Sequence, residues 1–225
     1  MKKKTIITID GPAGAGKTTV AKEVAKRLGF LYLDTGAMYR AMTLKALKAK
    51  ITPEEKERLV EMVNETILIV KKDEKKGMRL WVDGEEVTDK IRTEKVTNNI
   101  WWVCRVKEVR NKAKRIQREI GSDGNIVVEG RDIGTVVFPK APYKFYLDAS
   151  IEERAKRRWL EQKNKGMESS DMNKLKKDIA ERDRKDFTRE IAPLKKAEDA
   201  IAINTTGLTI EKVVEKIVSR VKGKG

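Results

Sequence analysis

The sequence contains no histidine and only one cysteine, Cys104. Without histidine, a serine or cysteine nucleophile cannot be activated by an imidazole, so hydrolases that depend on such a pair are excluded. A zinc site of the usual Cys/His type is excluded for the same reason. A single cysteine also cannot form an internal disulfide, so the fold must be held by its core.

Long apolar runs are missing as well. No segment approaches the roughly 20 apolar residues of a membrane-spanning helix. The N-terminal stretch "MKKKTIITIDGP" has only a short apolar run before an acidic residue, unlike a signal peptide. We therefore expect a cytoplasmic protein without membrane attachment.

Positive charge is abundant. The 225 residues include 51 Lys and Arg against 35 Asp and Glu, which gives a formal net charge of +16. Such a surface attracts anions, whether nucleic acid, an anionic membrane or phosphorylated metabolites, and the charge alone does not select among them. With 39% hydrophobic residues the chain can bury a large core, so we expect a folded protein.

The order of predicted elements indicates an α/β fold. A β-branched run at 5 to 11 ends in Gly-Pro, and a helical pattern follows at 17 to 29. A second strand at 30 to 34 precedes another helix, for which Thr35 is the expected N-cap. This alternation predicts a parallel sheet flanked by helices. Later strands are predicted at 125 to 130, 144 to 148 and 200 to 204.

Two interruptions of this core are predicted. Between 66 and 88, two β-rich runs flank a polar turn and a third short run follows, which indicates a small antiparallel element. Between 167 and 173, the small polar tract "MESSDMN" separates two charged helices and is a candidate lid.

The segment "GPAGAGKT" fits the pattern of a P-loop, G-x-x-x-x-G-K-[ST], between a predicted strand and a predicted helix. Glycines let the backbone wrap around phosphate oxygens, the helix N-terminus offers N–H groups, and Lys17 adds a positive charge. Thr18 is expected to bind Mg²⁺. The N-K-x-D signature of GTPases is absent, so we expect a small kinase. The expected ATP-binding residues here are Gly11, Pro12, Ala13, Gly14, Ala15, Gly16, Lys17, Thr18 and Thr19.

The run "RDRKDFTR" has three possible interpretations: a solvated helix face, a nucleic-acid patch or the wall of an anion pocket. At about 100 degrees per residue, Arg182, Asp186 and Arg189 lie within about 60 degrees of one another. Leu175 and Ile179 fall on the same side, so the charged trio continues an apolar stripe and faces inward.

Inward charges need partners or a ligand. Asp186 can neutralise only part of two guanidinium groups, and the planar arginine fork suits phosphate, so the trio favours an anion pocket. Arg184 lies on the opposite face and is expected at the surface. Arg131 and Asp132 follow a predicted strand, where ligands bind in open α/β sheets.

The P-loop, "DTGAMYR", "EGRDIGTVVFP" and "ERDRKDFTREIAPLKKAEDA" together closely resemble the bacterial cytidylate kinases, from about residue 4 to the C-terminus. The resemblance implies one P-loop kinase domain over 1–225, with a monophosphate-binding region at about 35–120 and a lid at about 153–175. It implies transfer of a phosphoryl group from MgATP to CMP or dCMP. We further expect Mg²⁺ as the cofactor, a monomer, and no need for nucleic acid.

The resemblance also assigns roles to individual residues. It implies that Asp186 binds the ribose, that Arg110 and Asp132 read cytosine, and that Asp34 and Thr35 begin the acceptor site. Four arginines are implied to hold the phosphate of CMP, namely Arg40, Arg131, Arg182 and Arg189. The last three, with Lys17, are the expected catalytic residues. The segment "ERAKRR" resembles an ATP lid, in which Arg154, Arg157 or Arg158 would approach the transferring phosphate.

Two positions depart from the family pattern. Trp101 stands where a small hydroxyl residue often contacts cytosine, so either the local helix is rotated or recognition depends more on Arg110 and Asp132. Glu129 stands where many relatives carry aspartate and is a candidate for a water-mediated magnesium contact. Two alternatives stay open: a kinase for UMP or AMP, and a basic RNA-binding protein.

Overall fold

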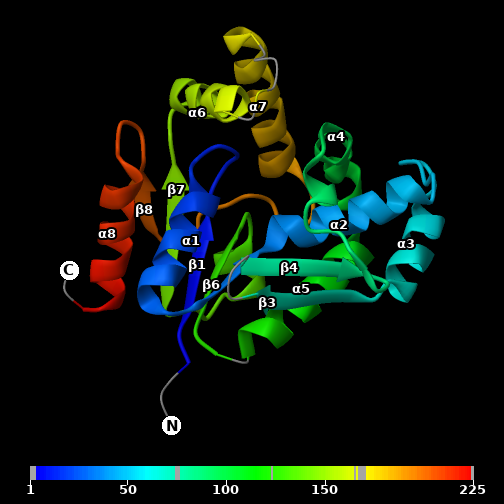
Figure 1. Ribbon diagram of the computed structural model, residues 1–225, viewed down its shortest axis with the longest axis horizontal. Helices are drawn as coiled ribbons and strands as arrows, with labels where there is room; N and C mark the ends of the chain where they lie inside the picture. The colour runs from blue at the N-terminus through cyan, green and yellow to red at the C-terminus, as the bar shows by residue number, and fades with distance from the viewer. Residues whose placement is uncertain (1–3, 74–76, 123, 165, 167–170, 224–225) are drawn as a thin grey trace. The chain divides into compact units, whose positions relative to one another are not determined.

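The computed structural model describes residues 4–73, 77–122, 124–164, 166 and 171–223 (Figure 1). The chain forms two compact units, one made of residues 1–30 with 126–225 and the other of residues 31–125. Each unit has its own sheet and its own helices. Throughout the described ranges, every helix is too short or too polar to cross a membrane.

The first unit is built on a parallel sheet. Its strands lie in the order β6-β1-β7-β8, and each neighbouring pair is parallel. Ile9 at the centre lies beside Glu129 on one side and Phe145 on the other. The prediction of a parallel α/β sheet is therefore confirmed. The strands are β1 (Ile6–Asp10), β6 (Ile126–Gly130), β7 (Tyr143–Asp148) and β8 (Ile201–Asn204).

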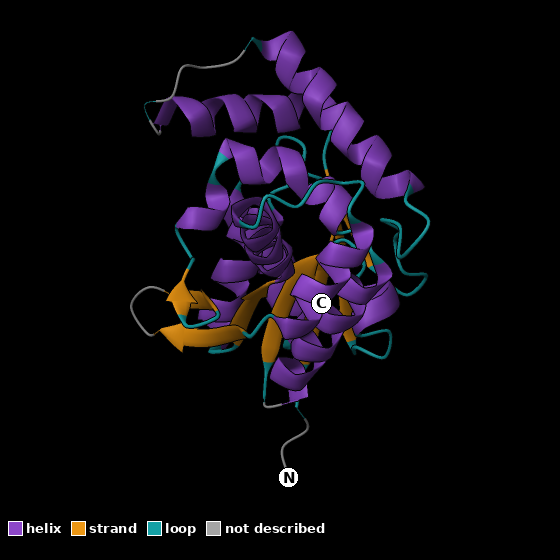
Figure 2. Ribbon diagram, turned by 90° about the vertical axis from the view of Figure 1, so that its right-hand side faces the viewer, coloured by secondary structure: helices purple, strands orange, loops and turns teal. Residues whose placement is uncertain are grey.

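Helices of the first unit form two pairs. Helix α1 packs against β6 and α8, and α6 packs against α7 through Ala155, Leu175 and Ile179. Both views show α6 and α7 side by side (Figures 1 and 2). A short π-helical turn, η2 (Ile133–Val137), follows β6 and was not predicted. The helices are α1 (Lys17–Leu28), α6 (Ile151–Asn164), α7 (Met172–Thr188) and α8 (Ile210–Val221).

The second unit is mainly helical. Buried side chains of α2, α3, α4 and α5, among them Met42, Leu59, Trp102 and Val109, form its core. The predicted antiparallel element is confirmed as a three-stranded sheet in the order β3-β4-β5. The elements of this unit are β2 (Leu31–Asp34), α2 (Thr35–Lys48), α3 (Lys56–Glu65), β3 (Leu68–Asp73), β4 (Gly77–Val82), β5 (Glu85–Glu86), η1 (Lys90–Arg92), α4 (Glu94–Val103) and α5 (Lys107–Ser122).

Two helix ends follow the local sequence, and one helix begins at a different cap from the predicted one. Gly29 ends α1 in the left-handed conformation, and the Thr209 side chain caps α8. Thr35 was the expected cap of α2, but Asp34 has this role and accepts a hydrogen bond from the Ala37 amide at 3.0 Å. Both aspartate and threonine side chains can cap a helix, and the N-cap of α2 lies one residue earlier than predicted. Of the candidate lid tract, residues 167–170 lie outside the described residues.

Candidate functional site

Glycines of the P-loop in the first unit adopt positive φ angles, and Gly11 lies close to the backbone of β7. Gly11 has φ of 147°, and a Cβ atom there would lie 2.0 Å from the carbonyl oxygen of Leu147. Gly16 has φ of 87° and precedes α1, whose N-terminus is not capped by any described side chain. The first N–H groups of α1 therefore remain available to an anion.

Lys17 is enclosed by protein at this turn. Its side chain is buried, with the residue 6% exposed, and Nζ donates a hydrogen bond to the carbonyl oxygen of Pro12 at 2.7 Å. Burial, and next the positive charge of Arg131, lowers the pKa of Lys17 to about 7. A triphosphate at this point would favour the charged lysine again, because a nearby anion raises the pKa of a cation.

Two side chains from outside the loop support it. Arg154 of α6 is buried and donates to the carbonyl oxygens of Ala13, at 3.1 Å, and Ala149, at 3.0 Å. It also forms a buried ion pair with Asp183 of α7. The Thr205 hydroxyl lies 3.3 Å from the Ala15 carbonyl oxygen and 3.0 Å from that of Asp148, and these two acceptors share its one proton. The loop is thus held through its own backbone, and Arg154 supports it. A contact between Arg154 and the transferring phosphate stays a prediction.

The other two lid arginines differ in their surroundings. Arg157 donates to the hydroxyl and carbonyl oxygens of Thr205, at 3.0 and 2.7 Å, and lies beside Gly16. Arg158 is exposed and pairs with Glu161 at 2.9 Å. The structure therefore brings Arg157 to the P-loop and does not bring Arg158 there. Their roles toward ATP remain predictions.

Helix α7 confirms the helical geometry expected for "RDRKDFTR" except at its end. Arg182 and Asp186 are half-buried on the side of the buried residues Leu175 and Ile179. Arg184 is exposed and pairs with Glu181. However, α7 ends at Thr188, and Arg189 has extended backbone, with φ of −65° and ψ of 139°. The turn out of the helix, and not continued helical spacing, places the Arg189 guanidinium.

These arginines form a network with carboxylates from two segments. Arg131 donates from Nε to Oδ2 of Asp186 at 2.8 Å. Arg189 lies 3.5 Å from Oδ1 of Asp132 and 3.9 Å from Oδ1 of Asp186. Asp132 is thus a second counter-charge for the arginines, beside Asp186, and was not predicted from the sequence. Burial alone would raise the pKa of Asp186, but Arg131 and Arg182 outweigh it and hold the pKa below its usual range.

Oxygen donors suited to Mg²⁺ lie near Lys17. Glu129 is buried at 4% exposure and acts electrostatically on Lys17, and Thr18 follows Lys17 at the start of α1. Within the described residues, no three acidic or thiol side chains gather into a metal cluster. Mg²⁺ keeps several waters and often binds through one or two protein groups plus phosphate, so hydroxyl and carboxylate donors fit it.

The sequence interpretation overlooked Asp10. It ends β1 directly before the P-loop, is 4% exposed, and accepts hydrogen bonds from the backbone amides of Ile133 and Gly134. An acidic residue at the end of an otherwise apolar strand was the available signal. Tyr39 and Asp183 were also missed, because their partners come from distant parts of the chain.

The second unit holds the start of the expected acceptor site. Besides capping α2, Asp34 forms an ion pair with Arg92 at 3.1 Å. Arg40 of the same helix donates to the hydroxyl of Thr97 on α4 at 2.7 Å. Thr35 is buried. This region therefore presents cations on a framework made by α2, η1 and α4.

Arg110, expected to read cytosine, is buried and tightly positioned. It donates to the carbonyl oxygen of Cys104 at 3.2 Å, and its guanidinium lies 5.3 Å from the centre of the Tyr39 ring. Trp101 packs against the core of this unit, and Arg105 covers its ring at 5.3 Å. The tryptophan is thus used in packing.

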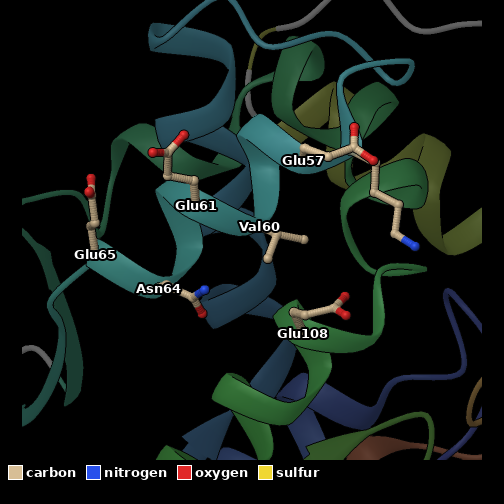
Figure 3. A pocket seen from close by; sticks show the side chains of 7 residues that line it. Glu57, Val60, Glu61, Asn64, Glu65 and Glu108 are labelled. Atoms are coloured by element: carbon tan, nitrogen blue, oxygen red, sulfur yellow. The ribbon is translucent and has the colours of Figure 1, made fainter.

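Two surface hollows are also present. One lies along α3 and the start of α5 and is lined mainly by glutamates, with Glu108 facing Val60 across it (Figure 3). Its negative charge is unsuited to a phosphate. The other adjoins Thr18 and Thr19 and extends to Thr209 and Ile210 at the start of α8, next to the P-loop.

Comparison with known proteins agrees with this arrangement. The family described as cytidylate kinase matches residues 7–223. A cytidylate kinase from a Geobacillus strain is 50% identical over 218 residues, covering 97% of this chain and 96% of that protein. One from Bacillus cereus is 47% identical over 223 residues, covering 99% and 98%. An uncharacterised protein from Eubacterium ventriosum, 12% identical, covers 97% of this chain and 99% of that chain with a TM-score of 0.55, which concerns the fold alone.

Proposed function

The chain belongs to the cytidylate kinase family, and we propose from this premise that it transfers the γ-phosphoryl group of ATP to CMP or dCMP. The products are CDP or dCDP, and ADP. The observation that supports the proposal best is the network of Arg131, Arg182, Asp186 and Arg189. The charges of Arg131, Arg182 and Asp186 act on the buried P-loop lysine, Lys17. This network supplies the cations that phosphoryl transfer needs.

The chemistry requires no strong base. An oxygen of the CMP phosphate is already an anionic nucleophile and attacks the γ-phosphorus in line with the bond to the leaving oxygen of ADP. One P–O bond forms, the bond between the γ-phosphorus and the bridging oxygen breaks, and ADP keeps the electron pair. The absence of histidine is therefore compatible with the reaction, since positioning and charge neutralisation do most of the work.

On the donor side, we assign ATP binding to the P-loop residues 11–19, with Lys17 beside the transferring phosphate. Thr18, and Glu129 through water, would hold Mg²⁺, which when bound neutralises charge on the phosphates. Arg157 is the better placed of the two lid arginines for ATP, because it already lies beside Gly16. We also assign Arg158 to ATP binding, although here it is exposed and pairs with Glu161.

On the acceptor side, we assign the CMP phosphate to Arg40, Arg131, Arg182 and Arg189, and the ribose to Asp186. Arg110 and Asp132 would read the base, with Asp34 and Thr35 at the start of the acceptor site. The lowered pKa of Asp186 keeps it ionised, which suits a carboxylate that accepts hydrogen bonds from ribose hydroxyls. We infer that Trp101 leaves base recognition to Arg110 and Asp132.

We also propose the regions that bind each nucleotide, the localisation and the oligomeric state. We assign residues 35–120 to monophosphate binding, which is supported by the compact unit of residues 31–125, and residues 153–175 to the lid. We expect a cytoplasmic monomer that works without nucleic acid. Size-exclusion chromatography with light scattering tests the monomer.

An acceptor comparison tests the function. CMP, dCMP, UMP and AMP would be assayed with saturating MgATP, and we expect CMP and dCMP to give the highest kcat/KM. A preference for AMP or UMP would contradict the cytidylate assignment and leave the kinase fold intact.

A further inference from the structure

Asp10 has an unusual position for an acidic residue. It lies at the end of β1 and is almost fully buried. Its Oδ1 accepts a hydrogen bond from the Ile133 amide at 2.9 Å, and its Oδ2 accepts one from the Gly134 amide at 2.7 Å. Both oxygens of one carboxylate are therefore used by two successive amides of a segment more than 120 residues away.

The two amides belong to the turn that follows Arg131 and Asp132. The Asp132 carbonyl oxygen closes this turn by accepting hydrogen bonds from the amides of Val136, at 2.9 Å, and Val137, at 3.2 Å. Fixing the Ile133 and Gly134 amides therefore fixes the backbone that carries Arg131 and Asp132. Those side chains reach Asp186 and Arg189.

The fit between the strand and the turn is close. A Cβ atom on Gly134 would lie 3.0 Å from the Thr8 hydroxyl oxygen and 3.3 Å from Oδ2 of Asp10. The turn thus lies directly over β1, and the carboxylate fills the space between them. Asparagine would offer one acceptor and would direct an NH₂ group at the other amide, while a hydroxyl residue would be too short to reach both.

This use of a carboxylate has a cost for folding. Burial raises the pKa of Asp10 to about 6, and the charge of Asp132 raises it as well, while the two amides and Lys17 act in the opposite direction. An ionised group in such surroundings is unfavourable unless its hydrogen bonds are complete. The two amides need two acceptors, and the two carboxylate oxygens of Asp10 provide them. This geometry points to a role for Asp10 in holding the turn.

We propose that Asp10 is a positioning residue for the acceptor nucleotide, whose carboxylate holds the turn after β6 so that Arg131 and Asp132 face CMP correctly. This rests on the proposed function, because it takes CMP as the acceptor. Loss of the carboxylate should loosen phosphate binding by Arg131 and base selection by Asp132. The P-loop has its own supports in Arg154 and Thr205, so ATP binding should change little.

The test uses Asp10→Asn and Asp10→Ala, with Thr8→Val as the matched control. Thr8 is buried on the same strand, and its hydroxyl is among the buried groups without a hydrogen-bond partner in the described structure, so valine should be accommodated without loss. We expect Asp10→Asn to raise the KM for CMP by about tenfold and Asp10→Ala by more, with the KM for ATP changed less than about twofold. The ratio of kcat/KM for CMP over UMP should fall in both variants.

The results distinguish a failure of the proposed function from a failure of the proposed role of Asp10. If the wild-type enzyme does not phosphorylate CMP, the proposed function fails. If it does, and folded Asp10 variants keep the wild-type KM for CMP and the same base preference, the role of Asp10 is refuted. A rise in the KM for ATP alone would also refute it, because that indicates a P-loop role.

A pH series on the wild type decides the question if both variants fail to fold. The ratio of kcat/KM for CMP over UMP cancels titration of the acceptor phosphate, which the two nucleotides share. It should fall as the pH drops below about 6, where Asp10 gains a proton beside Asp132 and Lys17. A ratio that stays constant from pH 7.5 to 5.5 would overturn the proposal.

Discussion

Arg131 donates from Nε to Oδ2 of Asp186 over 2.8 Å, which joins the end of β6 to the last turns of α7. Neither group is free to relax, because both side chains are more than four-fifths buried. The arginine to which we assign the CMP phosphate is therefore held in place by contacts within the protein itself. Such preorganisation lowers the cost of aligning charges during phosphoryl transfer.

The cations on α7 should differ sharply in importance. Arg182→Ala should lower kcat/KM for CMP by about tenfold to a hundredfold, because a charged hydrogen bond in a buried site is typically worth about 1.5–3 kcal/mol. Arg184→Ala is the matched control. Its exposed pair with Glu181 is worth little, so activity should stay within about twofold of wild type. Steady-state kinetics with CMP as the varied substrate would check this, and equal effects would contradict the inward-facing assignment.

Lys17 should be essential for turnover but not for folding. Lys17→Ala removes a charge that neutralises the transferring phosphate, and we expect kcat to fall by about 10²- to 10³-fold or more. Within the described part of the chain its side chain donates one hydrogen bond, to the Pro12 carbonyl oxygen, so circular dichroism and the melting temperature should change little. Substantial remaining ATP turnover would refute the phosphate-binding assignment.

The buried pair of Arg154 and Asp183 should be important for stability. Arg154→Ala leaves Asp183 buried without its partner, and we expect the free energy of unfolding in urea to fall by about 3–5 kcal/mol. Replacing both residues, as Arg154→Met with Asp183→Leu, should recover much of the loss. Arg158→Ala is the control on the same helix, and its exposed pair should change stability by less than about 1 kcal/mol. Equal losses in both single variants would argue against a supporting role for Arg154.

Asp10 should make stability depend on pH in a defined direction. Its pKa is raised in the folded state, from 3.8 to about 6, so the folded protein holds the proton more tightly than the unfolded chain does. The stabilising contribution of protonated Asp10 is fully present below about pH 4 and is lost as the pH rises through about 6. At about 1.4 kcal/mol per pKa unit, the loss is about 3 kcal/mol.

The corresponding measurement compares wild type with Asp10→Asn. The free energy of unfolding of the wild type minus that of Asp10→Asn should fall by about 3 kcal/mol between pH 4 and pH 7, since asparagine does not titrate. Urea unfolding at several pH values would check it. A difference that is independent of pH would mean that Asp10 is not buried as an ionised carboxylate at neutral pH.

Much of the fold follows from local patterns in the sequence. Short β-branched runs predicted the strands that β1 and β6 form, and the helix predicted at 17 to 29 ends at Gly29, because these effects act within a few residues. The one wrong cap, Thr35 in place of Asp34, reflects two neighbouring residues that can both serve. The π-helical turn after β6 was not predicted, and its first two amides bond to a carboxylate from β1, which lies far away in the sequence.

For the site, the sequence by itself determined the P-loop, the kinase class and the inward stripe of Arg182 and Asp186, all of which depend on spacing within one segment. Only the tertiary structure decided which charges neutralise one another. Asp132 meets Arg189, Arg154 supports the P-loop, and Asp10 bonds to a turn far along the chain, because folding brings together groups separated by 57 to 141 positions. Pairing in a buried network depends on distances of a few ångströms, which no periodicity in the sequence records.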